Sequence, residues 1–151
     1  MKEAIYYPVG QQNFRELRED RCVYVDKTPY LAKIVDSKVR YWFLARPRRF
    51  GKSLFLSTLE YFYKGERELF KGLFIDSMDW DWEEYPVLRI DLNTEKYREP
   101  GLLDKVLNDY FKEFEEKYGI EIKAETLSRR FARIIEAAHE KTGRQVVVLV
   151  D

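Results

Sequence analysis

Cysteine and histidine are almost absent from this chain of 151 residues. With Cys22 as its single cysteine, the chain cannot form an internal disulfide, and this composition suits a reducing compartment such as the cytoplasm. We expect Cys22 to be a small apolar residue of the interior. His139, the one histidine, stands near the end of a predicted helix, where we interpret it as a solvated residue rather than a catalytic base.

The sequence also lacks long apolar runs and an excess of charge of either sign. No apolar run approaches the length of a membrane span, and the N-terminus lacks the apolar region of a signal peptide, so we expect no membrane partner. The 27 Lys and Arg residues balance the 27 Asp and Glu residues, which argues against nucleic-acid binding by the surface as a whole. Local basic clusters could still contact nucleic acid, so that partner stays open.

The composition is that of a globular protein. Hydrophobic residues make up 45% and charged residues 36% of the chain, and this length is enough for one domain with a substantial core. We therefore expect one structural domain over residues 1–151. Within it, residues 1–40 are predicted to be an N-terminal segment that leads into the core at residues 41–151.

Hydrophobic patterning predicts strands that alternate with helices. Apolar residues at steps of three and four predict two long helices, which end at Gly119 and Gly143. Another helix is predicted from residue 52 to about residue 63. Strands are predicted at residues 41–45, 87–92 and 146–150. The last strand is a continuous β-branched run, which favours burial on both faces. The alternation indicates an α/β fold with a mainly parallel sheet.

A stretch ending in Gly51-Lys52-Ser53 lies between the predicted strand at 41–45 and the helix that follows. A strand, a tight turn and a helix in this order place backbone N–H groups and the positive end of the helix where nucleotide phosphates bind. The stretch departs from the usual G-x-x-x-x-G-K-[ST] pattern because Arg46 stands at the first glycine position. Taken alone, Gly-Lys-Ser would be interpreted as a surface turn, but its flanking elements favour a nucleotide site.

The residues of this stretch have expected roles in binding ATP. Lys52 would contact the β- and γ-phosphates and act as a catalytic residue, and the Ser53 hydroxyl would bind Mg²⁺. The backbone from Arg48 to Ser53 would surround the phosphates. The residues predicted to bind the nucleotide are Arg48, Arg49, Phe50, Gly51, Lys52, Ser53 and Leu54.

Asp151 stands at the end of the predicted strand 146–150. A carboxylate at the end of a buried apolar strand is costly unless it has a partner. In nucleotide sites such a carboxylate holds Mg²⁺, directly or through water, and Mg²⁺ takes one or two carboxylates together with phosphate oxygens. We therefore predict Asp151 as a metal ligand and catalytic residue. By itself, a solvated aspartate at a strand end would be the better interpretation.

Two further groups of residues have alternative interpretations. Arg46, Arg48 and Arg49 could neutralise phosphate charge or contact a neighbouring subunit, or they could form salt bridges with the acidic segment 76–84. Residues 24–28 could lie beside the base of the nucleotide, or Asp26 and Lys27 could form a pair that stabilises a turn.

Three segments together resemble the AAA-ATPase-like family of bacterial and archaeal proteins. They are Tyr24-Val25-Asp26-Lys27-Thr28, then Arg46-Pro47-Arg48-Arg49-Phe50-Gly51-Lys52-Ser53, and the segment from Lys141 to Asp151. The resemblance implies a P-loop NTPase fold, which is a three-layer sandwich whose sheet has the strand order 5-1-4-3-2. Residues 41–45, 87–92 and 146–150 would be strands 1, 2 and 3 of that sheet. Strands 4 and 5 would be missing, so we expect an incomplete sheet.

The resemblance also implies that the chain is the N-terminal piece of a longer protein. Many family members continue into a nuclease-like C-terminal domain, which would then be a partner of this segment. Unpaired strand edges invite association, so we expect the isolated chain to be poorly stable or to self-associate. A homo-oligomer is a further open partner.

The function expected from these observations is Mg²⁺-dependent ATP binding by a P-loop ATPase module. Hydrolysis is expected of the longer protein, because many such ATPases carry a catalytic glutamate just after the aspartate that corresponds to Asp151. One alternative is a nucleotide-dependent switch that does not hydrolyse ATP and controls an attached effector. Another is a protein that handles nucleic acid. The motif does not decide between ATP and GTP.

Overall fold

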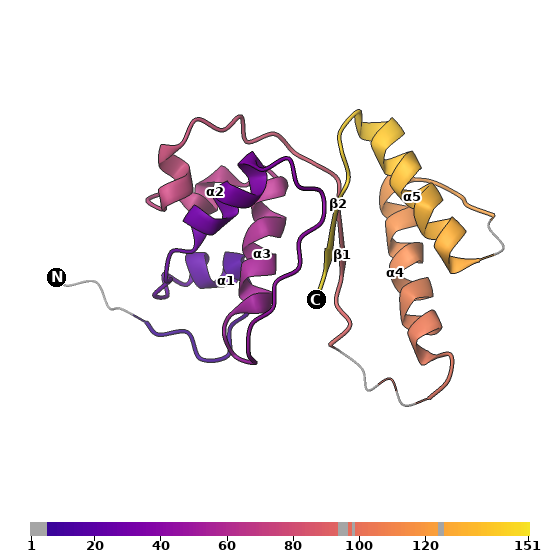
Figure 1. Cartoon of the computed structure of the whole chain (residues 1–151), viewed down its shortest axis with the longest axis horizontal. Helices are drawn as coiled ribbons and strands as arrows, with labels where there is room; N and C mark the ends of the chain where they lie inside the picture. The colour runs from indigo at the N-terminus through magenta and orange to yellow at the C-terminus, as the bar shows by residue number, and fades with distance from the viewer. Residues whose placement is uncertain (1–5, 94–96, 98, 124–125) are drawn as a thin grey trace. The chain divides into compact units, whose positions relative to one another are not determined.

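A computed structural model describes residues 6–93, 97, 99–123 and 126–151. The chain divides into two compact units, Met1–Glu84 and Tyr85–Asp151, which we call the N-terminal and C-terminal units (Figure 1). The described residues form a mixed α/β structure with five α-helices and one parallel sheet of two strands. None of these helices is both long and apolar enough to cross a membrane.

The N-terminal unit is built from helices around an aromatic core. Its elements are α1 (Phe14–Glu19), α2 (Thr28–Asp36), α3 (Lys52–Tyr63), and the 3-10 helices η1 (Arg67–Phe70) and η2 (Phe74–Ser77). The Phe62 ring packs edge-on against the rings of Phe70 and Trp82, with centroids 6.0 and 5.1 Å away. The side chains buried in this unit include Phe14, Leu17, Leu31, Phe55, Leu59, Phe62, Phe70 and Ile75.

Helix α3 is held in this core by polar as well as apolar contacts. Ser57 and Thr58 are fully buried, but both hydroxyls have partners. The Ser57 Oγ accepts a hydrogen bond from the Phe14 N–H at 2.9 Å, and the Thr58 hydroxyl lies 2.9 Å from the Leu54 carbonyl that accepts its hydrogen bond. Because no polar group of this pair is left unsatisfied, α3 gives a fixed base for the loop that precedes it. The helix begins at Lys52, as the sequence predicts.

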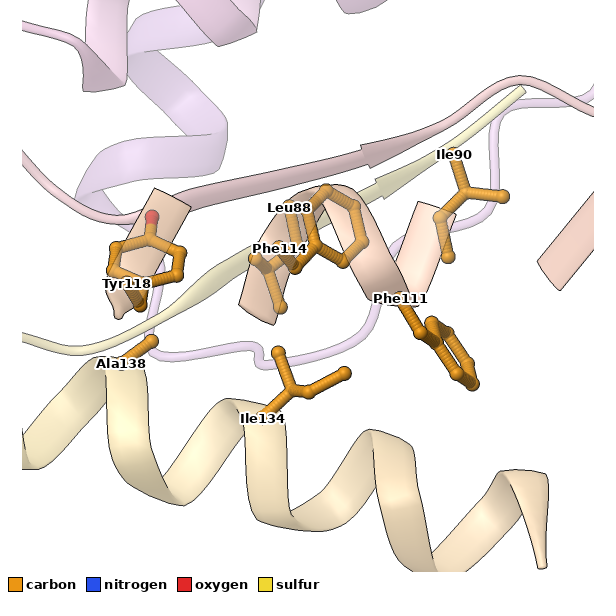
Figure 2. Packing of buried hydrophobic residues seen from close by; sticks show 7 residues of the cluster. All are labelled: Leu88, Ile90, Phe111, Phe114, Tyr118, Ile134 and Ala138. Atoms are coloured by element: carbon orange, nitrogen blue, oxygen red, sulfur yellow. The ribbon is translucent and has the colours of Figure 1, made fainter. Parts of the chain in front are cut away.

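The C-terminal unit places two helices against a strand pair. Its elements are β1 (Val87–Ile90), α4 (Leu102–Tyr118), α5 (Leu127–Thr142) and β2 (Val147–Val150). Figure 2 shows Ile134 and Ala138 of α5 directed toward side chains of α4 and β1. The buried cluster consists of Leu88, Ile90, Phe111, Phe114, Tyr118, Ile134 and Ala138. The predicted helix ends are confirmed, since Gly119 and Gly143 follow α4 and α5 with φ of 61° and 67°.

Strands β1 and β2 are parallel neighbours, with Val87 opposite Val147 and Ile90 opposite Val150. This pairing is the one that the implied strand order gives to its strands 2 and 3. The prediction that the last strand is buried on both faces is wrong. Val148 and Val150 are 38% and 54% exposed, because β2 has one neighbour, β1, in the described part of the chain.

The predicted strand at residues 41–45 is also wrong for this structure. These residues have no regular secondary structure, and all of them are exposed; Tyr41 and Phe43 reach 89% and 93%. A strand is stabilised by pairing with neighbours, and the implied neighbours of this segment are strands 4 and 5. Among the described residues, no segment takes their place. The apolar pattern is therefore present without the hydrogen-bonded partner that would make it a strand.

The two compact units do not test the predicted division of the chain into residues 1–40 and 41–151. Residues 40 and 41, where the N-terminal segment was expected to lead into the core, both lie inside the N-terminal unit. The change from one unit to the other falls between Glu84 and Tyr85. A single structural domain over residues 1–151 stays a prediction.

Asp26 and Thr28 connect the start of α2 to η2. Asp26 Oδ1 accepts hydrogen bonds from the Thr28 N–H (2.8 Å) and the Thr28 hydroxyl (2.7 Å), and Oδ2 accepts one from the Phe74 N–H (2.7 Å). The Thr28 Oγ1, fully buried, accepts a further bond from the Ile75 N–H at 3.1 Å. Burial alone would raise the pKa of Asp26, but the hydrogen bonds from Phe74 and Thr28 outweigh it and hold that pKa below its usual value.

These contacts support one of the two interpretations of residues 24–28. Asp26 has a structural role, as expected, but its hydrogen-bond partners are Thr28 and Phe74 rather than Lys27. Helix α2 begins at Thr28, and Lys27 takes the cap position.

We expect Phe43→Lys to reduce self-association of the chain without lowering its melting temperature. Phe43 is 93% exposed, so the substitution removes apolar surface that makes no packing contribution, and the shift should stay within about 2 °C. Val9→Lys is the matched control, since Val9 is 94% exposed and lies outside residues 41–45. Sedimentation velocity over a range of concentrations measures the effect. A wild-type chain that is monomeric throughout, with a sharp cooperative melt, would contradict the expectation.

Asp26→Ala should lower the free energy of unfolding by about 1–2 kcal/mol, the value of a few partly exposed hydrogen bonds to a charged group. Because the folded state depresses the pKa of Asp26, its contribution is complete above the unfolded pKa. It is lost as the pH falls through the folded value. The difference between wild type and variant in urea unfolding should therefore be constant at neutral pH and shrink below about pH 4. Asp79→Ala, at an exposed aspartate, is the control, and an equal loss there would refute the assignment.

Candidate nucleotide-binding site

The segment of residues 46–53, which we call the phosphate loop, leads directly into α3. The Lys52 side chain folds back over it. Lys52 Nζ donates hydrogen bonds to the carbonyls of Arg46 at 2.9 Å and Pro47 at 3.3 Å. The ammonium thus joins the two ends of the loop. Contact between Lys52 and nucleotide phosphates stays a prediction.

The backbone of the loop turns through two left-handed residues. Arg49 has a φ of 67° and Gly51 a φ of 75°. Glycine adopts this conformation without strain, whereas a residue with a Cβ incurs about 1–2 kcal/mol. Turns that combine left-handed residues with negative-φ neighbours form concavities lined by N–H groups, to which anions bind. The left-handed conformation of Arg49 is strained, and contacts with a bound ligand would compensate for that strain.

The N-terminus of α3 carries no side-chain cap. Gly51 occupies the cap position, and no side-chain hydrogen bond reaches the first N–H groups of the helix. These groups carry the positive end of the helix dipole. Ser53 lies in this first turn and is half-buried. The loop and the uncapped turn together form an environment that favours a phosphate group.

A pocket of about 310 Å³ adjoins the phosphate loop. Its walls come from the segment before α2, from the loop and from the start of α3. Lys27 and Arg49 are the charged residues among those that line it, and both are cationic. The lining residues are Pro8, Leu17, Val23, Tyr24, Val25, Lys27, Arg49, Phe50, Gly51, Leu54 and Phe55. The pocket is therefore lined mainly by apolar residues, and two cationic side chains stand among them.

Lys27 reaches the phosphate loop from the start of α2. Its Nζ lies 3.4 Å from the Phe50 carbonyl and would lie 3.2 Å from a Cβ placed on Gly51. The sequence analysis did not find this contact, because it depends on the packing of two segments far apart in the chain. Proximity of Lys27 to the loop is compatible with the interpretation that residues 24–28 lie beside a nucleotide.

The three arginines of the loop do not contact the acidic segment in the described part of the chain. Arg46, Arg48 and Arg49 are exposed. Asp76, the first residue of that segment, instead lies 3.4 Å from Arg67 Nε and accepts a hydrogen bond from the Gly72 N–H. The salt-bridge alternative has no support in these contacts, and the arginine charges are available to a ligand.

Asp151 belongs to the C-terminal unit and follows β2. Its backbone extends the pairing with β1, since its N–H donates to the Ile90 carbonyl and its carbonyl accepts from the Leu92 N–H. Its Oδ2 is buried and has no hydrogen-bond partner among the described residues. A buried carboxylate oxygen without a donor is costly, and it fits the needs of a cation.

The described residues contain no cluster of three or more His, Cys, Asp or Glu side chains arranged to hold a metal. Lys52 and Ser53 belong to one unit and Asp151 to the other. Their convergence on one ligand stays a prediction.

Comparisons with known proteins identify the family of this chain. The chain is 40% identical over 146 residues to a protein of Azotobacter chroococcum mcd 1 that is described as an uncharacterized protein in the vnfD 5' region. The match covers 95% of the present chain and 28% of that relative. No solved structure matches the chain. A family model described as a predicted AAA-ATPase matches residues 8–151. Because this match spans nearly the whole sequence, the chain belongs to the AAA-ATPase-like family.

Proposed function

We propose that the chain binds Mg²⁺ and ATP at the phosphate loop and serves as the nucleotide-binding module of a P-loop ATPase. The observation that carries this proposal is the Lys52 ammonium, folded over the loop at the uncapped N-terminus of α3. Membership of a family described as predicted AAA-ATPases supports it. Hydrolysis is proposed for the longer protein, of which the chain would supply the binding part.

Each part of the phosphate loop has a proposed task. Lys52 would exchange the carbonyls of Arg46 and Pro47 for the β- and γ-phosphate oxygens, which offer it a full counter-charge. The N–H groups from Arg48 to Leu54 would donate to the remaining phosphate oxygens. The guanidinium groups of Arg48 and Arg49 would offset the charge of the polyphosphate. Catalysis at such sites is mainly positioning and charge stabilisation, so these binding contacts are also the catalytic ones.

The apolar lining of the pocket would hold the base of the nucleotide. Val23, Val25, Leu54 and Phe55 line it, and a planar base gains stability from contact with side chains of this kind. This arrangement would make the segment before α2 a neighbour of the base, in line with one interpretation of residues 24–28. ATP is the proposed nucleotide, with GTP as an outcome that competition binding would reveal.

The metal ligands proposed are Ser53 and Asp151. The buried, unpartnered Oδ2 of Asp151 and the hydroxyl of Ser53 in the first turn of α3 are the oxygen donors that Mg²⁺ prefers. When bound, Mg²⁺ would neutralise charge on the β- and γ-phosphate oxygens. Asp151 would be held in place by its backbone hydrogen bonds to β1.

The complete fold proposed is the three-layer P-loop sandwich. The parallel pair of β1 and β2 has the neighbours and direction of strands 2 and 3 in that sheet. Residues 41–45 would become strand 1 once flanking strands are available. A cytoplasmic location, a homo-oligomer and a nuclease-like C-terminal partner are further proposals that await direct tests.

Lys52→Ala should weaken ATP binding by roughly a hundredfold or more, because two charge-assisted hydrogen bonds are lost. Isothermal titration calorimetry with Mg²⁺ and ATP measures the change. Lys71→Ala is the matched control, since Lys71 is exposed on the surface and pairs with Glu68. Equal ATP affinity in wild type and Lys52→Ala would refute the proposed function.

Asp151→Asn and Ser53→Ala should each remove most of the dependence of ATP affinity on Mg²⁺. We expect wild type to bind ATP more tightly with Mg²⁺ than with EDTA, and we expect the two affinities to converge in each variant. The same titration in both buffers measures this, with Asp79→Asn as the control. If a variant keeps the full effect of Mg²⁺ on ATP affinity, the residue replaced in that variant is not a metal ligand.

A further inference from the structure

We propose that Lys27 is a second phosphate-binding lysine of this site, supplied from outside the phosphate loop. It would donate to the polyphosphate of the ligand beside Gly51, in addition to Lys52. This inference rests on the proposed function and names the chemistry of one more group at the same site.

The ammonium of Lys27 lies at the turn where phosphates would bind. A Cβ on Gly51 would come within 3.2 Å of Lys27 Nζ, so glycine leaves the approach between the lysine and the backbone open. The Phe50 carbonyl lies 3.4 Å from the same atom. This distance is long for a charge-assisted hydrogen bond, which is normally about 2.7–2.9 Å. The contact places Lys27 at the loop and uses one of the three donors of its ammonium.

Among the described residues that line the pocket, none is acidic, so none balances the charge of Lys27 there. The other charged residue that lines the pocket is the cationic Arg49. The neighbouring carboxylate of Asp26 accepts its hydrogen bonds from Thr28 and Phe74. Two cations that line one pocket, next to an uncapped helix N-terminus, repel each other unless an anion lies between them. A phosphate chain is the anion that fits these donors.

The local structure around Lys27 is unfavourable for a lysine. Lys27 occupies the N-cap position of α2 and gives no side-chain cap hydrogen bond. Serine, threonine, aspartate and asparagine are preferred there, and the helix dipole disfavours a cation at this end. The residues on either side follow the local rules, since Asp26 and Thr28 are tied by hydrogen bonds. A departure from local preference at one position of an otherwise well-formed turn is typical of a functional residue.

The same turn holds the lysine in place. Thr28 is fully buried and Asp26 is bonded to η2, so the backbone of Lys27 is fixed between them. The side chain is half-buried along the pocket wall. Because the backbone is already fixed, only the flexible side chain of Lys27 has to be ordered when it contacts a phosphate.

The test compares Lys27→Met with Lys33→Met by calorimetric titration of the whole chain. Lys33 is an exposed lysine of the same helix. The probes are Mg²⁺ with ATP, and inorganic tripolyphosphate, which has no base. We expect Lys27→Met to weaken binding of both probes by about tenfold or more, the usual loss for one charge-assisted hydrogen bond, and Lys33→Met to bind both like wild type. Lys27→Arg should recover most of the lost affinity, because it keeps the charge.

Two results would overturn the inference. One is equal affinity of Lys27→Met and Lys33→Met for both probes. The other is a loss for ATP alone with tripolyphosphate unaffected, which would place Lys27 at the base. If Lys27→Met fails to melt cooperatively, Lys27→Gln replaces it and is judged by the same criteria. Lys52→Ala in the same series separates the two proposals. If Lys52→Ala loses affinity for the probes and Lys27→Met does not, the second lysine is contradicted and the proposed function is not.

Discussion

The ammonium of Lys52 organises the candidate site. By bonding to the carbonyls of Arg46 and Pro47, it holds the beginning of the phosphate loop against its end. The loop has little else to hold it, since residues 46–50 are exposed and their arginines form no ion pair with the acidic segment among the described residues. A carbonyl is a weaker partner for an ammonium than a phosphate oxygen, so the same contact that shapes the loop can be exchanged for a ligand.

The N-terminal unit supports this loop from two sides. Buried Phe55, Leu59 and Phe62 fix α3, and the hydrogen bonds of Asp26 and Thr28 fix the start of α2. Lys27 extends from the second support toward Gly51. An exposed loop between rigid supports is the usual arrangement for a binding site, because the scaffold positions the donors while the loop admits the ligand.

Local patterns in the sequence predicted helices α3, α4 and α5 and the paired strands β1 and β2. The repeat of apolar residues gave α4 and α5, and Gly119 and Gly143 ended them as expected, because a left-handed residue after a helix favours glycine. The strand at residues 41–45 failed because strand formation depends on a neighbour, which a local pattern does not reveal. Lys27 and Thr28 were underestimated for a related reason. Their contacts with Phe50 and Ile75 are tertiary, so a local sequence pattern does not reveal them.

The phosphate loop can be tested at its own backbone by following the amide ¹⁵N–¹H signals of the labelled chain during titration with Mg²⁺ and ATP. If the N–H groups at the start of α3 hold the phosphates, Gly51, Lys52 and Ser53 should show the largest and saturable shifts, with tripolyphosphate reproducing them. Saturable binding that leaves these three amides unmoved, with shifts confined to other parts of the chain, would contradict a phosphate site built on this turn.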